Sequence, residues 1–235
     1  MNRFATAIED LDWQNITAQL DQEGFAVLQG ILNADSIAEL AKLRTGDAAQ
    51  VRINLSAKQL GQGLSIRWMS ELPTVLSSLK EGFYGPLAQV ANHWNETLQL
   101  SYRYPENLQQ FEAECLEAGQ QKELTELTCF CAEDYLGLQQ NADGDRVFPL
   151  QLVGLLSTAG EDHTGGELVL TEQRPRMQSR PMVVPLQKGD IAIITTSQRP
   201  FKGSKGFYRV NVKHAISRVR SGERVGFSIS FHFSP

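Results

Sequence analysis

The chain has 235 residues, a net charge of −5 and an apolar fraction of 41%, which suits one domain, or one domain with a helical extension, around a sizeable core. No apolar run approaches the length of a membrane span, and the N-terminus lacks the charged-then-apolar pattern of a signal peptide. The three cysteines, Cys115, Cys129 and Cys131, do not form a disulfide framework by number or spacing. We therefore expect a cytoplasmic protein with no membrane contact.

Basic residues are concentrated in the C-terminal half. The segment from Arg174 to Arg224 contains 12 Lys or Arg and two acids, so it carries +10 and leaves −15 for the rest of the chain. This asymmetry would attract an anion to the C-terminal half. A solvated basic surface explains the same pattern.

The first half of the chain predicts mainly helices. A short strand is expected at residues 25–28, and Asn33 is a good N-cap for the helix that follows. Pro86 should break or kink the long helical pattern that contains it. Apolar residues recur at helical spacing over residues 34–43, 72–98 and 106–119.

Short strand-like runs separated by turn signals follow residue 124. They cover residues 127–132, 147–156, 167–171, 182–186, 190–196, 208–212 and 225–233. Helices followed by many short strands predict an α+β chain that ends in an antiparallel sandwich or barrel. We expect residues 1–123 to be a helical region that supports a core of residues 124–235, the two forming one compact unit.

An ordered set of motifs in the second half of the chain resembles that of a known protein family. Gly165-Gly166-Glu167-Leu168 is followed by Lys188-Gly189-Asp190, then His214, then Arg224. This order resembles the second half of a barrel of the Fe(II)/2-oxoglutarate oxygenase superfamily. The run Leu-Thr-Glu-Gln-Arg-Pro-Arg-Met-Gln-Ser-Arg at 170–180 is similar to the bacterial Oxygenase-NA family, and the resemblance covers roughly residues 20–233. It implies N-terminal helices packed on a double-stranded β-helix, a jelly-roll or cupin-like barrel.

The resemblance also identifies an altered iron site. Superfamily catalysis uses two histidines and one carboxylate on Fe(II), with 2-oxoglutarate and O2 on the remaining positions. The family pattern Asp-Tyr-x-x-Leu-His-x-Asp reads here as Asp134-Tyr135, two residues, then Leu138-Gln139-Gln140-Asn141. Gln139 and Asn141 therefore stand where the proximal ligands are expected, while His214 retains the distal position. Tight Fe(II) binding is not expected, and 2-oxoglutarate remains a candidate ligand.

Substitute ligands would need a rearranged backbone. His163, Asp143 and Asp145 are the candidates, and His163 lies in a predicted turn before the glycine pair. Arg224 is expected to point inward and to grip the far carboxylate of 2-oxoglutarate, as in the superfamily. A surface arginine is the other interpretation. Tyr135 is a further candidate for cofactor binding.

Three arginines of the specific run, Arg174, Arg176 and Arg180, form a candidate anion or substrate contact. Inter-strand salt bridges would explain the same cluster.

Three functions are open at this point. The first is an oxygenase-fold protein with a degenerate metal centre that keeps a carboxylate pocket, does not hydroxylate, and acts as a binding, sensing or partner protein. The second is an active 2-oxoglutarate-dependent Fe(II) dioxygenase with non-standard ligands and an unknown substrate, such as a protein or nucleic acid. The third is a nucleic-acid-associated module that uses the basic C-terminal half, although a net negative chain without an aromatic platform disfavours it.

Overall fold

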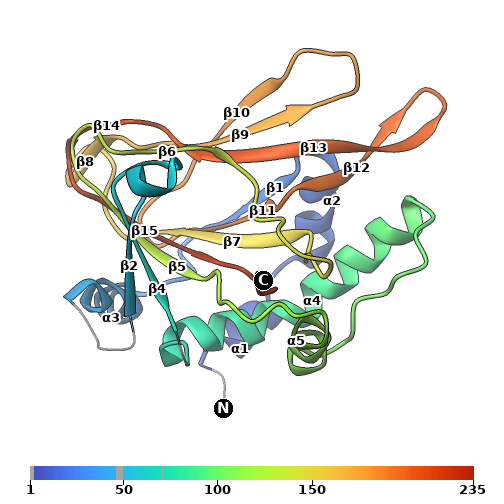
Figure 1. Ribbon diagram of the computed structural model, residues 1–235, viewed down its shortest axis with the longest axis horizontal. Helices are drawn as coiled ribbons and strands as arrows, with labels where there is room; N and C mark the ends of the chain where they lie inside the picture. The colour runs from blue at the N-terminus through green and yellow to red at the C-terminus, as the bar shows by residue number, and fades with distance from the viewer. Residues whose placement is uncertain (1–2, 46–49, 70) are drawn as a thin grey trace.

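The computed structural model describes residues 3–45, 50–69 and 71–235. Helices lie on one side of a large sheet, and a smaller sheet covers its other side (Figure 1). The helices are α1 (Ala5–Glu9), α2 (Trp13–Glu23), α3 (Ala34–Lys42), α4 (Thr74–Thr97) and α5 (Leu108–Glu117), with short 3-10 turns at Leu43–Thr45 and Ser56–Lys58.

The large sheet runs across both halves of the sequence. Its strands, in spatial order, are β1 (Phe25–Leu28), β11 (Ile191–Thr195), β7 (Leu150–Leu155), β15 (Arg224–Ile229), β5 (Glu126–Phe130), β4 (Leu64–Trp68) and β2 (Gln50–Asn54). All neighbouring pairs are antiparallel.

The smaller sheet carries two hairpins that extend beyond the body of the molecule (Figure 1). Its strands, in order, are β10 (Arg180–Val184), β9 (Leu168–Gln173), β13 (Gly206–Ile216), β6 (Tyr135–Gln139) and β3 (Gly61–Gln62), with β12 (Gln198–Gly203) paired to β13. A two-stranded ribbon of β8 (His163–Gly165) and β14 (Val219–Gly222) lies beside them. The hairpins are β9–β10 and β12–β13.

Two hydrophobic cores hold these layers together. The first packs helix residues such as Phe83 and Trp94 against one face of the large sheet, which contributes Phe227. The second lies between the sheets and includes Val153 of β7 and Val212 of β13. Because side chains alternate along a strand, the face of β15 opposite Phe227 points between the sheets.

Helix α4 is continuous through Pro86, so the expected break is absent. Proline removes one backbone hydrogen bond. Apolar residues on both sides of it, including Leu79 and Val90, are buried in the same core. At 24 residues α4 is the longest helix described, and no helix in the described part of the chain is long and apolar enough to cross a membrane.

The expected division at residue 123 is too simple. Strand β1 pairs with β11, and β4 pairs with β5, so the N-terminal region extends the large sheet instead of only supporting it with helices. Strands β2, β3 and β4 were not expected from the sequence, because residues 50–68 form short, glycine-dotted runs of mixed polarity. The strand at Phe25–Leu28 and the N-cap at Asn33, whose side chain accepts from the Ser36 amide, are confirmed.

Candidate functional site

Strand β6 places Gln139 directly opposite His214 on β13 in antiparallel register. Asn141 lies two residues beyond Gln139, just past the end of β6. The fold thus brings together the three positions that the family resemblance assigns to the iron site. It does so because β6 and β13 are neighbours in the smaller sheet.

A chain of hydrogen bonds occupies this place. The Asn141 Nδ2 donates to Gln151 Oε1 at 3.1 Å, and Gln151 Nε2 lies 3.2 Å from Nδ1 of His214. Gln151 and His214 are both buried. Burial lowers the pKa of His214 to about 4, so its ring is neutral at pH 7. One of its two ring nitrogens is therefore engaged by an amide.

The neighbouring Gln140 supports this arrangement. Its Nε2 donates to the backbone oxygens of Ser197 at 2.9 Å and Val212 at 2.8 Å. These bonds tie the segment after β6 to strand β13 and to the loop before β12. They hold Asn141 where it can reach Gln151.

Gln151 was missed by sequence reasoning. It lies in the apolar run 147–156, where every residue of β7 is buried. The polarity of the residues therefore does not show which face of the strand each side chain is on. A polar side chain within such a run was the available signal, because buried amides need partners.

The substitute ligands lie elsewhere. Asp143 and Asp145 are exposed in the loop after Asn141. His163 is on β8, which pairs with β14 away from the β6–β13 register. In the ranges that the structure describes, no group of three His, Cys, Asp or Glu side chains could hold a metal ion.

Arg224 begins β15 and points between the two sheets, with 1% of its surface exposed. Its Nε donates to the Gly166 carbonyl at 2.7 Å, and it forms no ion pair with any described residue. Burial lowers its pKa to about 10, which still leaves the guanidinium charged at neutral pH. The inward orientation expected from the sequence is what the structure shows.

Two glycines make room for this side chain. Gly166 adopts a φ of +72°, and a Cβ there would lie 2.7 Å from Arg224 Cδ. A Cβ at Gly226 would lie 2.8 Å from Arg224 Nη1. The second glycine of the Gly165-Gly166 pair is therefore needed both for its backbone conformation and for the passage of the arginine.

Arg224 lines a cavity of about 330 Å³. His163 and Glu167 also line it, together with the apolar side chains of Leu155, Leu168, Val184 and Leu186. The lining includes neither His214 nor the amides beside it. The buried side chain of Val153 stands on β7 between Gln151 and Leu155, so the two polar regions occupy different levels of the barrel.

Tyr135 is 40% exposed on β6 and is not part of this lining. Its strand pairs there with Gln62 of β3.

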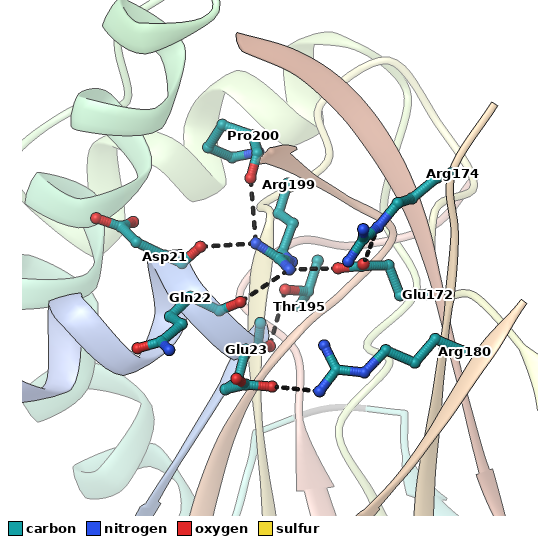
Figure 2. A network of polar contacts seen from close by, with 10 residues as sticks. Asp21, Gln22, Glu23, Glu172, Arg174, Arg180, Thr195, Arg199 and Pro200 are labelled. Atoms are coloured by element: carbon teal, nitrogen blue, oxygen red, sulfur yellow. Dashed lines mark hydrogen bonds and ion pairs between the residues drawn. The ribbon is translucent and has the colours of Figure 1, made fainter. Parts of the chain in front are cut away.

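Two of the three arginines in the candidate anion contact are engaged in ion pairs (Figure 2). Arg174 Nε lies 2.9 Å from Glu172 Oε1 and its guanidinium stacks over Phe201, while Arg180 pairs with Glu23 at 3.1 Å. Arg176 is exposed at the hairpin tip, with a φ of +62°. Arg174 and Arg180 are thus ion-paired, but not between strands as the sequence suggested: Glu172 lies two residues before Arg174, and Glu23 is the last residue of α2.

The centre of that network is Arg199, which sequence reasoning did not single out. It is 1% exposed, pairs with the buried Glu172, and donates to the carbonyls of Asp21, Gln22 and Pro200 (Figure 2). These bonds join the end of α2 to strands β9 and β12.

The profile of the family Oxygenase-NA, described as "Oxygenase, catalysing oxidative methylation of damaged DNA", matches residues 65–234. Two uncharacterized proteins of Mycobacterium tuberculosis, from strains CDC 1551 and H37Rv, are each 37% identical to the chain over 161 residues. That span covers 68% of this chain and 69% of theirs.

Solved structures show the same fold at low identity. A Pseudomonas putida prolyl-4-hydroxylase matches with a TM-score of 0.56 and 12% identity over 95% of this chain and 100% of that one. A 2OG-Fe(II) oxygenase-family oxidoreductase of Burkholderia pseudomallei matches with a TM-score of 0.54 and 14% identity. The match covers 96% of this chain and 94% of that one. The non-heme alpha-ketoglutarate-dependent epimerase SnoN from nogalamycin biosynthesis has a TM-score of 0.54 and 14% identity. This match covers 92% of this chain and 80% of that one. The expected double-stranded β-helix fold is confirmed.

Proposed function

We propose, given that this chain belongs to the Oxygenase-NA family and so to the 2-oxoglutarate/Fe(II) oxygenase superfamily, that it has lost the iron centre and binds a small carboxylate without oxidising it. The hydrogen-bonded chain Asn141–Gln151–His214 at the iron position carries this proposal.

The residues at that position do not fit Fe(II). The family set of two imidazoles and one carboxylate is reduced to one imidazole, His214, and the amides of Gln139 and Asn141. Neutral amides supply no negative charge to offset the metal, and Fe(II) prefers imidazole and carboxylate. A metal bound through Nδ1 of His214 would also have to displace the hydrogen bond that this nitrogen makes with Gln151.

The carboxylate pocket is supported by Arg224. A buried guanidinium without an acidic partner is costly, roughly several kcal/mol, unless a ligand supplies the opposite charge. The side chain's planar fork suits a carboxylate, which it can bind through two parallel hydrogen bonds. Arg224 would hold one carboxylate of 2-oxoglutarate if that family cofactor binds.

Anaerobic titration with Fe(II) and 2-oxoglutarate tests the loss of the iron centre. The proposal predicts no metal-to-ligand charge-transfer band in the wild type and no difference from His214→Ala. A saturable band that disappears in His214→Ala would overturn the proposal. It would favour the alternative, an active 2-oxoglutarate-dependent Fe(II) dioxygenase with non-standard ligands, in keeping with the oxygenase description of the family.

A second candidate function, nucleic-acid binding, is favoured by the two protruding hairpins. Arg176 on the β9–β10 hairpin and Lys202, Lys205, Arg209 and Lys213 on β12–β13 are exposed, and none forms an ion pair with a described residue. Such cations can contact phosphates.

Binding to short single- and double-stranded DNA at increasing salt tests this candidate. Affinity that falls steeply with salt and is lost in Arg176→Ala/Lys202→Ala/Lys205→Ala would support it. The matched control is Arg174→Ala, since Arg174 is engaged with Glu172. Binding that is absent, or insensitive to both salt and the triple substitution, would exclude it.

A further inference from the structure

The cavity beside Arg224 contains a second polar group without a partner. His163 is 3% exposed and lines the cavity. Its Nδ1 lies 3.0 Å from the Gly165 carbonyl, while its Nε2 is buried and has no hydrogen-bond partner in the described part of the chain. Buried polar atoms in native proteins are nearly always satisfied, so this nitrogen points to a missing ligand atom.

The chemistry of the two groups is complementary. A carbonyl oxygen only accepts, so Nδ1 of His163 carries the proton and, in the neutral ring, Nε2 is an acceptor. Burial and the nearby Arg224 lower the pKa of His163, which keeps the ring neutral. The terminal amino groups of Arg224 are donors, and neither has a hydrogen bond to a described residue.

One acid already lines the cavity, and it is engaged elsewhere. Glu167 is exposed and accepts a hydrogen bond from the Ser217 hydroxyl. It forms no ion pair with Arg224 in the described ranges. The remaining walls, from Leu155, Leu168, Val184 and Leu186, suit a short hydrocarbon segment.

We propose that this cavity binds a small hydroxy acid, with its carboxylate on Arg224 and its hydroxyl donating to Nε2 of His163. The inference rests on the proposed carboxylate pocket and deepens it by naming the ligand class. A hydroxyl suits the site better than an ammonium group, because an ammonium would be repelled by the guanidinium. A volume of about 330 Å³ lies at the small end of ligand pockets.

The binding needs no metal. The cavity lining excludes His214, Gln139, Asn141 and Gln151, and Val153 separates the two levels along β7. Hydroxy-acid binding should therefore be unchanged by a chelator.

Calorimetric titration of the full chain in EDTA tests the inference with matched acids that differ by one hydroxyl. The probes are lactate against propionate, malate against succinate, and 3-hydroxybutyrate against butyrate. We expect at least one hydroxy acid to bind about tenfold more tightly than its partner, the effect of one net hydrogen bond. His163→Leu should abolish that preference without weakening the plain acid, and His163→Gln, which returns an acceptor near the Nε2 position, should restore part of it.

The outcomes separate the two proposals. Equal binding of both members of every pair, lost in Arg224→Met, would overturn the hydroxy-acid inference and leave the carboxylate pocket intact. A preference that survives in His163→Leu would also overturn it. No binding of any acid to the wild type would overturn the carboxylate pocket and the inference together. Thermal melting of each variant shows that it is folded.

Discussion

The two polar levels of the barrel differ in how well their buried groups are satisfied. At the level of His214, the side chains of Asn141 and Gln151 form a hydrogen-bonded chain that ends on Nδ1 of the imidazole. At the level of Arg224, a buried cation has a single hydrogen bond, and the Nε2 of His163 has none to a described residue. Protein interiors rarely leave such groups unpaired. The amides of the first level bond to one another and to the imidazole, whereas the second level leaves donors of Arg224 and an acceptor of His163 for a ligand.

The buried arginines provide the sharpest test of this comparison. Arg199 and Arg224 are equally buried, but Arg199 has an acidic partner and three backbone carbonyls while Arg224 has one carbonyl. Arg199→Met should lower the free energy of unfolding by about 3–5 kcal/mol, because the buried Glu172 carboxylate keeps only Arg174 as a partner and three carbonyls lose their donor. Arg224→Met should change it by less than about 1 kcal/mol, or raise it, since an unpaired charge is removed. Denaturant unfolding measures both, and equal losses would mean that Arg224 has a structural partner.

Acidification should destabilise the protein through its buried histidines. Burial lowers the pKa values of His214 and His232 to about 4, while the unfolded chain takes up protons near the ordinary value of 6.5. Protons then bind preferentially to the unfolded state as pH falls from 6.5 to 4, which costs about 3 kcal/mol for each ring. His214→Gln should reduce the loss measured between pH 7 and pH 4 by about that amount. An unchanged pH dependence in this variant would contradict the buried, neutral His214.

The hydrogen-bonded chain through Gln151 predicts a smaller loss of stability when Gln151 is replaced. Gln151→Leu should lower the free energy of unfolding by about 2 kcal/mol, because it leaves Asn141 and Nδ1 of His214 unsatisfied. The matched control is Gln198→Leu, which removes an exposed amide bonded to Asn211 and should cost no more than about 0.5 kcal/mol. Similar losses in the two variants would show that the chain contributes little.

The smallest effect concerns the glycine that makes room for Arg224. Gly166→Ala should weaken carboxylate binding about tenfold, because the new methyl group would press on the Arg224 side chain. Backbone strain at the positive φ should also lower the free energy of unfolding by about 1 kcal/mol. Gly30→Ala should show the strain alone, since Gly30 also has a positive φ but open space around its Cβ position. Carboxylate titration and unfolding of both variants measure the difference. Unchanged binding in Gly166→Ala would argue against a fixed Arg224 geometry.

The sequence predicted the parts of the fold that follow from simple patterns. The strand expected at 225–233 is present as Arg224–Ile229, and its Val225, Phe227 and Ile229 lie in the first core because one face of β15 meets the helices. Strands β2, β3 and β4 were not predicted. They are short, and β3 and β4 pair with β6 and β5, which lie far along the chain.

The candidate site was predicted unevenly for the same reason. The positions of His214, Gln139 and Arg224 followed from the family motifs, and the register places the first two together. Gln151 and the pairing of His163 with Arg224 in one cavity depend on contacts between distant strands, which no local pattern contains.

The central claim is that amides in place of His and Asp abolish the iron centre, and rebuilding it is the most direct test. The double variant Gln139→His/Asn141→Asp should bind Fe(II) anaerobically and develop the charge-transfer band with 2-oxoglutarate, while the wild type shows none under the same conditions. A band of equal intensity in the wild type would contradict the account.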